Sequence, residues 1–364
     1  VKANSAATGS KSVRNSLYIV VARYNLCKDR CFLRINCYIR MMIRLSLIIP
    51  THNRSERLIA ALESVIRQDL PAADWECVVV SNNSTDDTVA RFGDFAARYP
   101  GLNLRLVTED GPGVSYARNR GIAETSAPLL VFIDDDERIN PGFLRAYADF
   151  FDAHPDAVVA GGRIIAEYVT GRPAWLSKYT EMPIANPMDF GDAVRPFPAG
   201  RVPGGGNMAF RRSAALRYGG FDPSLGRVGR MLIGGEENDF FERLMRGGET
   251  CWYVPGAVMW HIIPPEKLTE SYFRRLCYNV GVSQRLRAGM YRRYPKTLLF
   301  ECLKWGATLL LSLTMPPRKS LWLIRMRYEI SRGLLADPQS KTAVRRLRFC
   351  LSCDLLFRKD TFRF

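Results

Sequence analysis

The stretch "LLVFIDDDE" (residues 129–137) joins five apolar residues to three consecutive aspartates and a glutamate. An unbroken apolar run of this length is typical of a strand that is buried on both faces of a sheet. Three carboxylates side by side at the end of such a strand repel one another unless a positive charge lies among them. The sequence therefore raises the question of which positive charge Asp134, Asp135 and Asp136 meet.

Strands and helices alternate around this stretch. Apolar runs that predict strands are followed by segments whose apolar residues recur at helical spacing. This alternation predicts an α/β fold: a mixed, mostly parallel sheet sandwiched by helices, with a basic helical extension at the C-terminal end. The predicted strands are 45–50, 75–81, 102–109 and 128–134, and the predicted helices are 54–68, 87–99 and 114–126.

Polar clusters follow three of the predicted strands: "THNR" (51–54), "SNNSTDD" (81–87) and "DDDE" (134–137). Ligands of open α/β sheets bind beyond the carboxyl ends of the strands. The polarity of ordinary surface loops explains each cluster alone, but it explains their convergence on one edge less well. We therefore predict a ligand site at this edge.

The aspartate trio suits a hard divalent cation, Mg²⁺ or Mn²⁺, because such ions prefer carboxylate oxygens. A cation there would offset the repulsion among the carboxylates and could also hold a diphosphate. A solvated turn is the alternative interpretation of the same three residues.

The pattern is less regular after residue 140. Residues 170–206 are rich in Pro and Gly and predict a long loop region. "GGEENDFFERLMRGG" (234–248) predicts an acidic turn that leads into an amphipathic helix, and "TCWYVPGAVMWHI" (250–262) predicts two paired short strands.

Charge divides the chain into three parts within a net charge of +16. Residues 1–44 hold nine Lys/Arg and one acidic residue, residues 264–364 hold twenty-one Lys/Arg and seven acidic residues, and the part between them is acidic. We expect a basic leader at 1–43 that is disordered or a start-site artefact, a catalytic domain at 44–263 and a basic helical region at 264–364. Basic arms of this kind meet an anionic partner, either a membrane surface or nucleic acid.

The nine cysteines form no regular framework. Cys27, Cys31 and Cys37 with the pair Cys350 and Cys353 leave a zinc site open as an alternative. No histidine accompanies them at zinc-finger spacing, so reduced thiols in a cytosolic protein are the preferred interpretation.

Five segments of the sequence, in their order and spacing, resemble the family 2 glycosyltransferases of the GT-A fold. They are "LSLIIPTHNR", "VVVSNNSTDDT", "GPGVSYARNRGI", "VFIDDDE" and "GGEENDFFERL". The resemblance covers residues 45–263. It implies an inverting transfer of a sugar from a nucleotide-diphosphate donor to an acceptor hydroxyl, with a divalent cation as cofactor.

The resemblance also implies roles for individual residues on the donor side. The first loop would touch the nucleoside, Asn82 would read the base where an aspartate is usual, and Arg118 would lie near the phosphates or the sugar. A glycine-rich loop would lie beside the transferred sugar. The implied donor-binding residues are Pro50, Thr51, His52, Asn53, Asn82, Arg118, Asp134, Asp135, Gly205 and Asn207.

On the reaction side, the resemblance implies that Asp136 and Asp134 bind the cation, with His261 as a further metal or phosphate contact. The acid pair of the family corresponds to Glu236 and Glu237. We expect Glu237 to act as the base and Glu236 to support the site; Asp239, the alternative base, would otherwise serve as N-terminal charge for its helix.

The segment 297–315, "TLLFECLKWGATLLLSLTM", is the most apolar part of the C-terminal region. Glu301 and Lys304 argue against a full membrane span. An interfacial helix at the cytoplasmic face of the plasma membrane is the preferred interpretation, and it would suit a lipid-linked or other carbohydrate acceptor. A helical hairpin that packs on the catalytic domain is the alternative.

Two other functions remain open at this level. A sugar-nucleotide nucleotidyltransferase should carry a Gly-rich loop after its first strand, and "PTHNRSER" lacks glycine. A non-catalytic binding module is suggested by the isoelectric point of about 9.6. Such a module would bind nucleic acid or another partner. The acidic central part argues against it, because its carboxylates would repel phosphate without a cation, and we expect no nucleic-acid partner.

Overall fold

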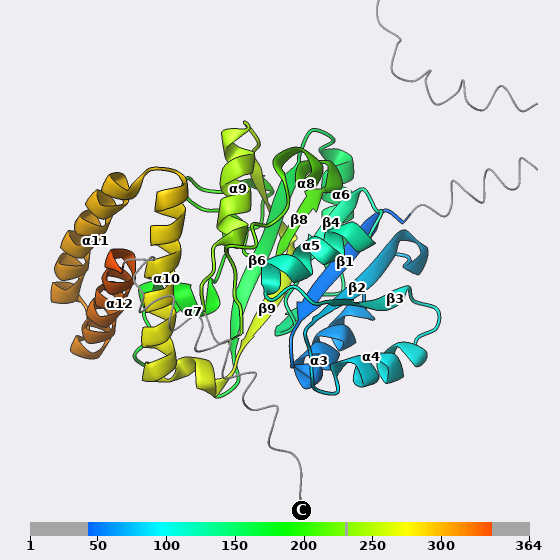
Figure 1. Ribbon diagram of the computed structural model, residues 1–364, viewed down its shortest axis with the longest axis horizontal. Helices are drawn as coiled ribbons and strands as arrows, with labels where there is room; N and C mark the ends of the chain where they lie inside the picture. Colours follow the sequence, from blue (N-terminus) through cyan, green and yellow to red (C-terminus); the bar gives the residue numbers. More distant parts are fainter. Residues whose placement is uncertain (1–42, 230–231, 337–364) are drawn as a thin grey trace, which may run out of the picture. The chain divides into compact units, whose positions relative to one another are not determined.

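The computed structural model describes residues 43–229 and 232–336 (Figure 1). The basic leader except for its last residue, and the five cysteines at 27, 31, 37, 350 and 353, lie outside these ranges. The expectations about a disordered leader and about zinc therefore concern parts of the chain that are not described.

The N-terminal half of the sheet is parallel, as the alternation of strands and helices predicts. Its spatial order is β3-β2-β1-β4, and Leu45 at the start of β1 is in register with both Trp75 and Leu129. All four strands therefore end at one edge, where the polar clusters follow them. The strands are β1 (Leu45–Thr51), β2 (Trp75–Asn82), β3 (Leu104–Glu109) and β4 (Leu129–Phe132).

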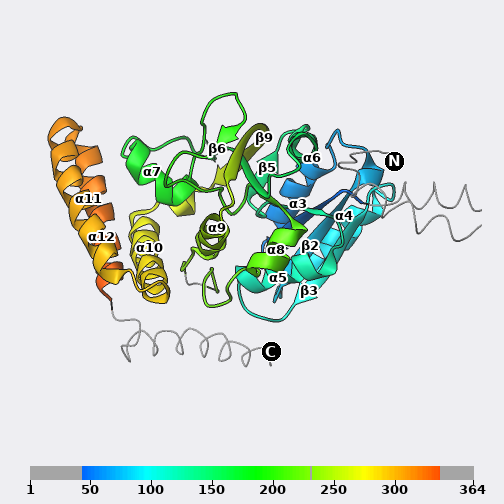
Figure 2. The same ribbon diagram turned by 90° about the horizontal axis from the view of Figure 1, so that it is seen from above.

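Helices cover both faces of this half. Right-handed crossovers place α3 (Ser55–Val65) and α4 (Thr88–Ala97) on one face, since β1, β2 and β3 follow one another in space. The chain then returns past β1 to reach β4, so α5 (Val114–Glu124) lies on the opposite face, as Figure 2 shows. The short 3₁₀ helix η1 (Ala72–Asp74) precedes β2.

The second half of the sheet is mixed. β8 (Met208–Arg211) runs antiparallel to both β4 and β6 (Val159–Tyr168), whereas β6 and β9 (Cys251–Ile263) are parallel. The short strands β5 (Glu137–Ile139) and β7 (Arg195–Pro196) both pair antiparallel with β9. The fold class expected from the sequence is confirmed. The helices of this half are α6 (Phe143–Ala153), α8 (Arg212–Tyr218) and α9 (Glu236–Arg246).

β9 differs from the two short strands that the sequence predicts. It is one strand of 13 residues, and its pairing with β6 jumps from Gly162↔Val254 to Arg163↔Val258. Residues 255–257, which include a proline without an N–H group, lie in this irregularity, so the proline does not interrupt the strand.

The expected long loop at 170–206 also contains a helix, α7 (Lys178–Ala185). A reciprocal capping box between Ser177 and Thr180 starts this helix. The box has threonine in the position where Glu or Gln is usual, so the sequence signal was weak.

Three helices follow the short 3₁₀ helix η2 (Pro265–Leu268) and form the described C-terminal part: α10 (Glu270–Met290), α11 (Tyr294–Thr314) and α12 (Pro317–Leu335). α10 and α12 approach backbone to backbone, because a Cβ atom at Gly281 would lie 2.0 Å from the Ile330 carbonyl oxygen and one at Gly333 would lie 2.0 Å from that of Tyr278. A second hydrophobic cluster lies here, with Trp175 stacked on Trp322 at 4.0 Å between ring centroids.

Candidate functional site

Each aspartate of the trio is paired with a cationic side chain of this chain. Arg118 donates to Asp134 at 3.0 Å, Arg54 to Asp135 at 2.8 Å, and Lys267 to Asp136 at 2.6 Å. These cations come from three distant parts of the sequence. They answer the question that the aspartate run raises, since the positive charge among the carboxylates is supplied by the protein itself.

The middle and last aspartates are buried in different electrostatic settings. Asp135 also accepts a hydrogen bond from the Thr51 hydroxyl at 2.8 Å, and burial raises the pKa of Asp135 to about 6 against the opposing effect of Arg54. Burial would raise the pKa of Asp136 as well, but Lys267, His261 and Arg54 outweigh it and hold that pKa well below its usual range. Asp136 is therefore more firmly ionised than Asp135.

Glu137, to which the sequence assigned no role, lies beneath the glycine-rich loop. Its carboxylate accepts the backbone N–H of Asp134 at 2.7 Å. Burial, reinforced by the charges of Asp134 and Asp136, raises the pKa of Glu137 well above its usual range. A Cβ atom at Gly206 would lie 1.8 Å from a Glu137 carboxylate oxygen, so this loop position requires glycine.

Arg118 joins the start of α9 to the edge of the sheet that carries Asp134, Asp135 and Asp136, here called the aspartate edge. Its guanidinium donates to Glu236 at 2.7 Å and to the Gly205 carbonyl at 3.2 Å, in addition to Asp134. Only 2% of the residue is exposed, so Arg118 is not a surface charge of its helix. Burial raises the pKa of Glu236, Glu237 adds to this rise, and Arg118 opposes it.

The acids of α9 have distinct surroundings. Glu237 is half-buried, and its carboxylate accepts from the Asn238 amide at 2.9 Å. Within the described ranges no Lys or Arg forms an ion pair with Glu237. Asp239 is buried and accepts from Arg243 at 2.9 Å and from the Tyr291 hydroxyl at 2.5 Å. Glu237 is thus the more accessible of the two candidate bases.

The loops after β1 and β2 contribute the exposed ring of His52 and the side-chain amides of Asn53 and Asn82, which bind the backbone. His52 is exposed, and its Nδ1 donates to the Asn82 carbonyl at 2.6 Å. The Asn53 side chain accepts the N–H of Thr85 at 2.6 Å. The Asn82 amide is bound to the backbone, since it donates to Gly111 and accepts from Gly113. This differs from the expected reader of a base edge.

Two further expected donor contacts lie inside the protein. Asn207 is fully buried, accepts from the Tyr147 hydroxyl at 2.5 Å and donates to the Ala257 carbonyl at 3.1 Å. It therefore anchors the loop and does not face the edge, in contrast to the expectation. Pro50 is likewise buried within β1, while Gly205 presents its carbonyl to Arg118.

The expected metal position holds the Lys267 ammonium. His261 Nε2 lies 3.2 Å from Lys267 Nζ and 3.9 Å from Asp136 Oδ1. Burial and Lys267 lower the pKa of His261, with Asp136 opposing, which favours the neutral imidazole. Across residues 43–229 and 232–336 no group of three or more His, Cys, Asp or Glu could hold a metal ion. As arranged here, Asp134, Asp136 and His261 do not fit the divalent cation that the sequence predicts.

Arg54 and Lys267 are the site residues that sequence reasoning missed. Arg54 stands in the "THNR" cluster and carries a signal, since it follows a strand that ends at the ligand edge. Lys267 lies 131 residues from Asp136, and no local pattern distinguishes it from the other basic residues of its region.

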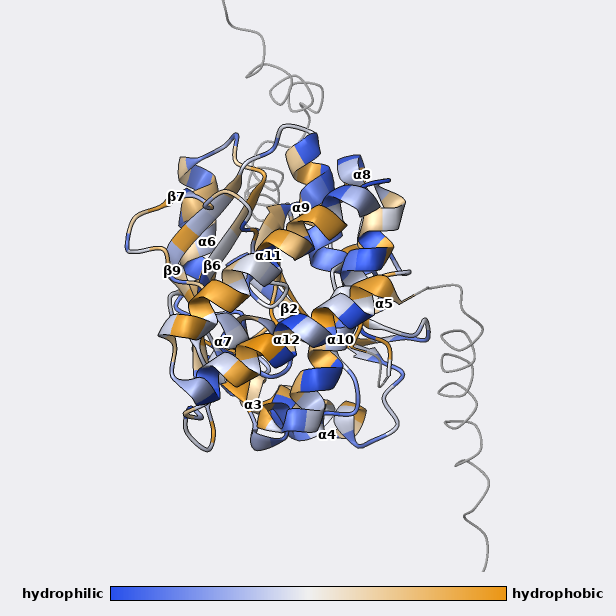
Figure 3. Ribbon diagram, turned by 90° about the vertical axis from the view of Figure 1, so that its left-hand side faces the viewer, coloured by the Kyte–Doolittle hydropathy of each residue, from blue (hydrophilic) through white to orange (hydrophobic). Residues whose placement is uncertain are grey.

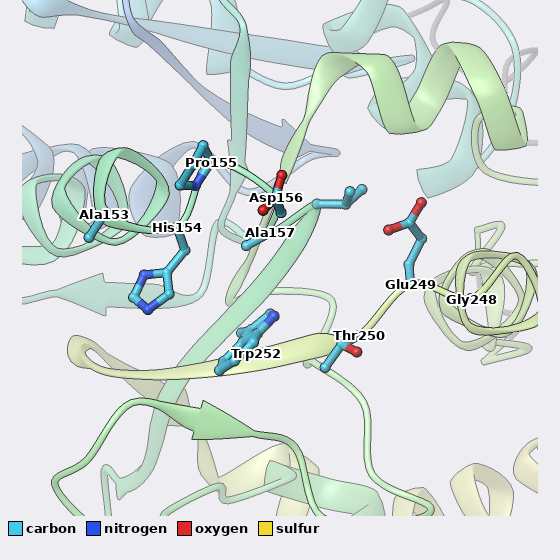
Figure 4. A pocket seen from close by; sticks show the side chains of 10 residues that line it. Ala153, His154, Pro155, Asp156, Ala157, Gly248, Glu249, Thr250 and Trp252 are labelled. Carbon is cyan, nitrogen blue, oxygen red and sulfur yellow. The ribbon is translucent and has the colours of Figure 1, made fainter. Parts of the chain in front are cut away.

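A pocket of about 440 Å³ lies elsewhere, at the edge where β6 and β9 begin. Figure 4 shows His154, Asp156, Glu249 and Trp252 around it. β4 also begins at this edge, because β8 runs antiparallel to both β4 and β6. The pocket is therefore at the end of the sheet opposite the aspartates and contributes none of their chemistry.

Comparison with known proteins shows a similarity to glycosyltransferases. Residues 46–219 match the family model of glycosyl transferase family 2. The glucosyl-dolichyl phosphate glucuronosyltransferase of Haloferax volcanii is 26% identical over 191 residues, which are 51% of this chain and 58% of that protein. A poly(ribitol-phosphate) β-N-acetylglucosaminyltransferase of Staphylococcus aureus is 31% identical over 122 residues, or 32% of this chain and 20% of that protein.

The chain thus spans little more than half of the first relative and a fifth of the second. Among solved structures, a mannosyltransferase of Pyrobaculum calidifontis in complex with GDP-Man and Mn²⁺ is 18% identical with a TM-score of 0.48, covering 86% of this chain and 81% of that one. The family match spans the strands and loops that form the aspartate edge. Residues 46–219, which include these strands and loops, are therefore similar to glycosyl transferase family 2.

Proposed function

We propose that this protein is an inverting glycosyltransferase that moves a sugar from a nucleotide-diphosphate donor to an acceptor hydroxyl. The observation that carries the proposal is the double contact of Arg118, at 3.0 Å with Asp134 and 2.7 Å with Glu236. Through it the strand-end aspartate and the acids of α9 meet at one point. A transferase needs such a meeting, because donor and acceptor react within one site.

On the donor side the exposed groups have complementary chemistry. The Asp134 side chain is 37% exposed and can accept from a sugar or ribose hydroxyl. Arg54 is similarly open and presents a guanidinium, which suits phosphate oxygens. The exposed His52 ring can stack on a base. These three groups give the donor a hydroxyl acceptor, a phosphate contact and a stacking surface.

On the acceptor side Glu237 is the proposed base. The acceptor oxygen attacks the anomeric carbon as the bond to the diphosphate oxygen breaks, and the hydroxyl proton passes to the Glu237 carboxylate. Attack from the face opposite the leaving diphosphate inverts the anomeric centre. Glu236, held by Arg118, supports the start of α9 and does not need to leave its pair. Asp239 is less suited, since Arg243 and Tyr291 already occupy its carboxylate.

The divalent cation, Mg²⁺ or Mn²⁺, implied by the resemblance has no place in this scheme. Lys267 Nζ already lies 2.6 Å from Asp136 Oδ2, in the position that a cation would take. No step of the proposed reaction passes through a metal, and Arg54, whose side chain is 39% exposed, faces the developing charge of the diphosphate instead.

We further propose that α11 attaches the enzyme to the cytoplasmic face of the plasma membrane. Glu301 is buried and paired with Arg327 at 3.1 Å, so the acid of this helix points inward. Six large apolar side chains point outward: Leu299, Phe300, Leu303, Leu309, Leu310 and Leu313. Figure 3 faces the side of the molecule that α11 and α12 form.

By length and composition alone, α11 is also the one helix of the described part that could cross a membrane, and 11% of its most apolar window is buried. Lys296 and Lys304 on the same helix favour an anionic interface over a span. A membrane position supports a lipid-linked or polysaccharide acceptor in cell-surface assembly. The name of the Haloferax relative, which includes a dolichyl phosphate, agrees with a lipid-linked substrate.

The experiment is a screen of UDP-, GDP- and dTDP-sugars for binding by calorimetry and for turnover with the full chain. We expect one donor to bind, and we expect Glu237→Gln to bind it unchanged while turnover falls by about 10²–10⁴-fold. Asp156→Asn, in the pocket at the opposite edge, is the matched control and should leave both quantities unchanged. A product with the donor's own anomeric configuration would exclude inversion. If no nucleotide binds, the non-catalytic binding module becomes the better interpretation.

A further inference from the structure

Lys267 occupies a built position between two metal-type ligands. Its side chain is 6% exposed, and its Nζ donates to Asp136 Oδ2 at 2.6 Å. On another side the same nitrogen lies 3.2 Å from His261 Nε2. Asp136 directly precedes β5, which pairs with the strand of His261, and the Ile262 N–H donates to the Asp136 carbonyl at 3.0 Å. The ammonium thus sits where a carboxylate and an imidazole converge.

The tautomer of His261 follows from its other nitrogen. Nδ1 lies 3.2 Å from the Ala185 carbonyl oxygen, which can only accept, so Nδ1 carries the proton. Nε2 of the neutral ring then offers its lone pair to Lys267. A carbonyl behind the distal ring nitrogen is also the arrangement that orients histidines as metal ligands. The lone pair that the ammonium uses is therefore the one that a metal ion would use.

The segment that carries Lys267 is anchored at both ends. Glu266 forms an ion pair with Arg57 of α3 at 2.6 Å, and the Lys267 backbone N–H donates to the Pro264 carbonyl. The Thr269 side chain caps α10 two residues later. Lys267 is consequently held over Asp136 by its backbone as well as by its charge.

We propose that the Lys267 ammonium is the resident cation at the Asp136–His261 position, and that a divalent metal ion cannot bind there while Lys267 does. Both cations would occupy the space between the Asp136 carboxylate and the lone pair of His261 Nε2. An ammonium donates hydrogen bonds to these atoms, whereas a metal ion must coordinate them directly. One position cannot serve both. The charge that faces this part of the proposed donor site is therefore covalently part of the chain.

The inference also predicts that donor binding does not depend on a metal ion, and this prediction rests on the proposed function. Its prediction about metal binding does not require a donor. The two can therefore fail separately.

The test uses Mn²⁺ alone as the probe, followed by electron paramagnetic resonance on the full chain. The wild type should bind no Mn²⁺ through Asp136, so Asp136→Asn should leave its titration unchanged. Lys267→Met keeps the length of the side chain and removes its charge. It should bind one Mn²⁺ at least tenfold more tightly than the wild type, and this gain should vanish when His261→Ala is added.

Three results would overturn the proposal. The first is a wild type that binds one Mn²⁺ and loses it with Asp136→Asn. The second is a Lys267→Met protein that melts like the wild type but gains no Mn²⁺ site. The third is donor binding that EDTA abolishes in the wild type. If Lys267→Met does not fold, Lys267→Arg, which keeps the charge, is used instead, and loss of its donor binding on addition of EDTA would also overturn the proposal. Failure of every sugar nucleotide to bind would count against the proposed function alone.

Discussion

The aspartate edge buries charged groups, whereas helix α11 exposes apolar ones. Both regions thus depart from the usual distribution, in which charged groups are exposed and apolar groups are buried. At the edge, Asp135 and Asp136 are buried, and each of the three strand-end aspartates is paired with Arg118, Arg54 or Lys267. On α11 the acid is turned inward and leucines face outward. Buried charge and exposed apolar area are each unfavourable in a protein that meets only water. This difference is the basis on which we propose two kinds of partner, a charged ligand at the edge and an apolar surface at α11.

The largest expected effect is at Arg118. Arg118→Ala removes the partner of Glu236 and of Asp134 at once and leaves buried carboxylates without compensation. We expect it to lower the free energy of unfolding by about 3–5 kcal/mol, measured by urea denaturation.

Arg120→Ala on the same helix is the matched control. Arg120 is exposed and forms a surface pair with Glu124 at 2.8 Å, and such pairs contribute about 0–1 kcal/mol. Equal losses for the two variants would show that the edge is an ordinary surface network.

The inward acid of α11 should have the next largest effect. Glu301→Gln weakens the contacts with Arg327 and Ser331, and we expect a loss of about 2–3 kcal/mol because a partly buried guanidinium loses its counter-charge. Lys304→Gln on the exposed side of the same helix should change stability by less than about 0.5 kcal/mol. If Lys304→Gln were the more damaging of the two, the inward orientation of the acid would not matter for folding.

Gly206→Ala should have a smaller effect that is confined to the edge. The added methyl would lie 1.8 Å from the Glu137 carboxylate, so the loop must move, at about 1–3 kcal/mol. We expect donor affinity to fall as well, because Gly205 and Arg118 move with the loop. Gly101→Ala, where no atom lies within 4 Å of the added Cβ, is the control by thermal denaturation and calorimetry. Full donor affinity in Gly206→Ala would separate this loop from the site.

The sequence predicted those parts of the fold and site that depend on local order. Apolar runs mark the parallel strands, and strand ends deliver Thr51 and Asp134 to one edge. The direction of a side chain depends on tertiary contacts, which is why Asn82 and Asn207 were expected to meet a ligand but instead hold backbone. The pairing of Asp136 with Lys267 spans 131 residues, so no local pattern could distinguish a lysine from a metal ion as the cation.

The smallest effect on stability, and the sharpest test of the comparison, concerns the outward leucines of α11. Leu310 and Leu313 are 68% and 83% exposed, so Leu310→Ser with Leu313→Ser should change the free energy of unfolding by less than about 1 kcal/mol. Their burial in a lipid interface is worth about 1.5–3 kcal/mol each, so binding to anionic vesicles should fall at least tenfold in a sedimentation assay.

Leu216→Ser on α8 is the control for these leucines. Leu216 is 79% exposed but lies outside the C-terminal helices, so its loss should leave vesicle binding unchanged. Unchanged vesicle binding by the double α11 variant would mean that its leucines face a protein partner or simply water. The aspartate edge would then be the only one of the two regions whose reversed polarity reflects a ligand, and the acceptor would not need to be held at a membrane.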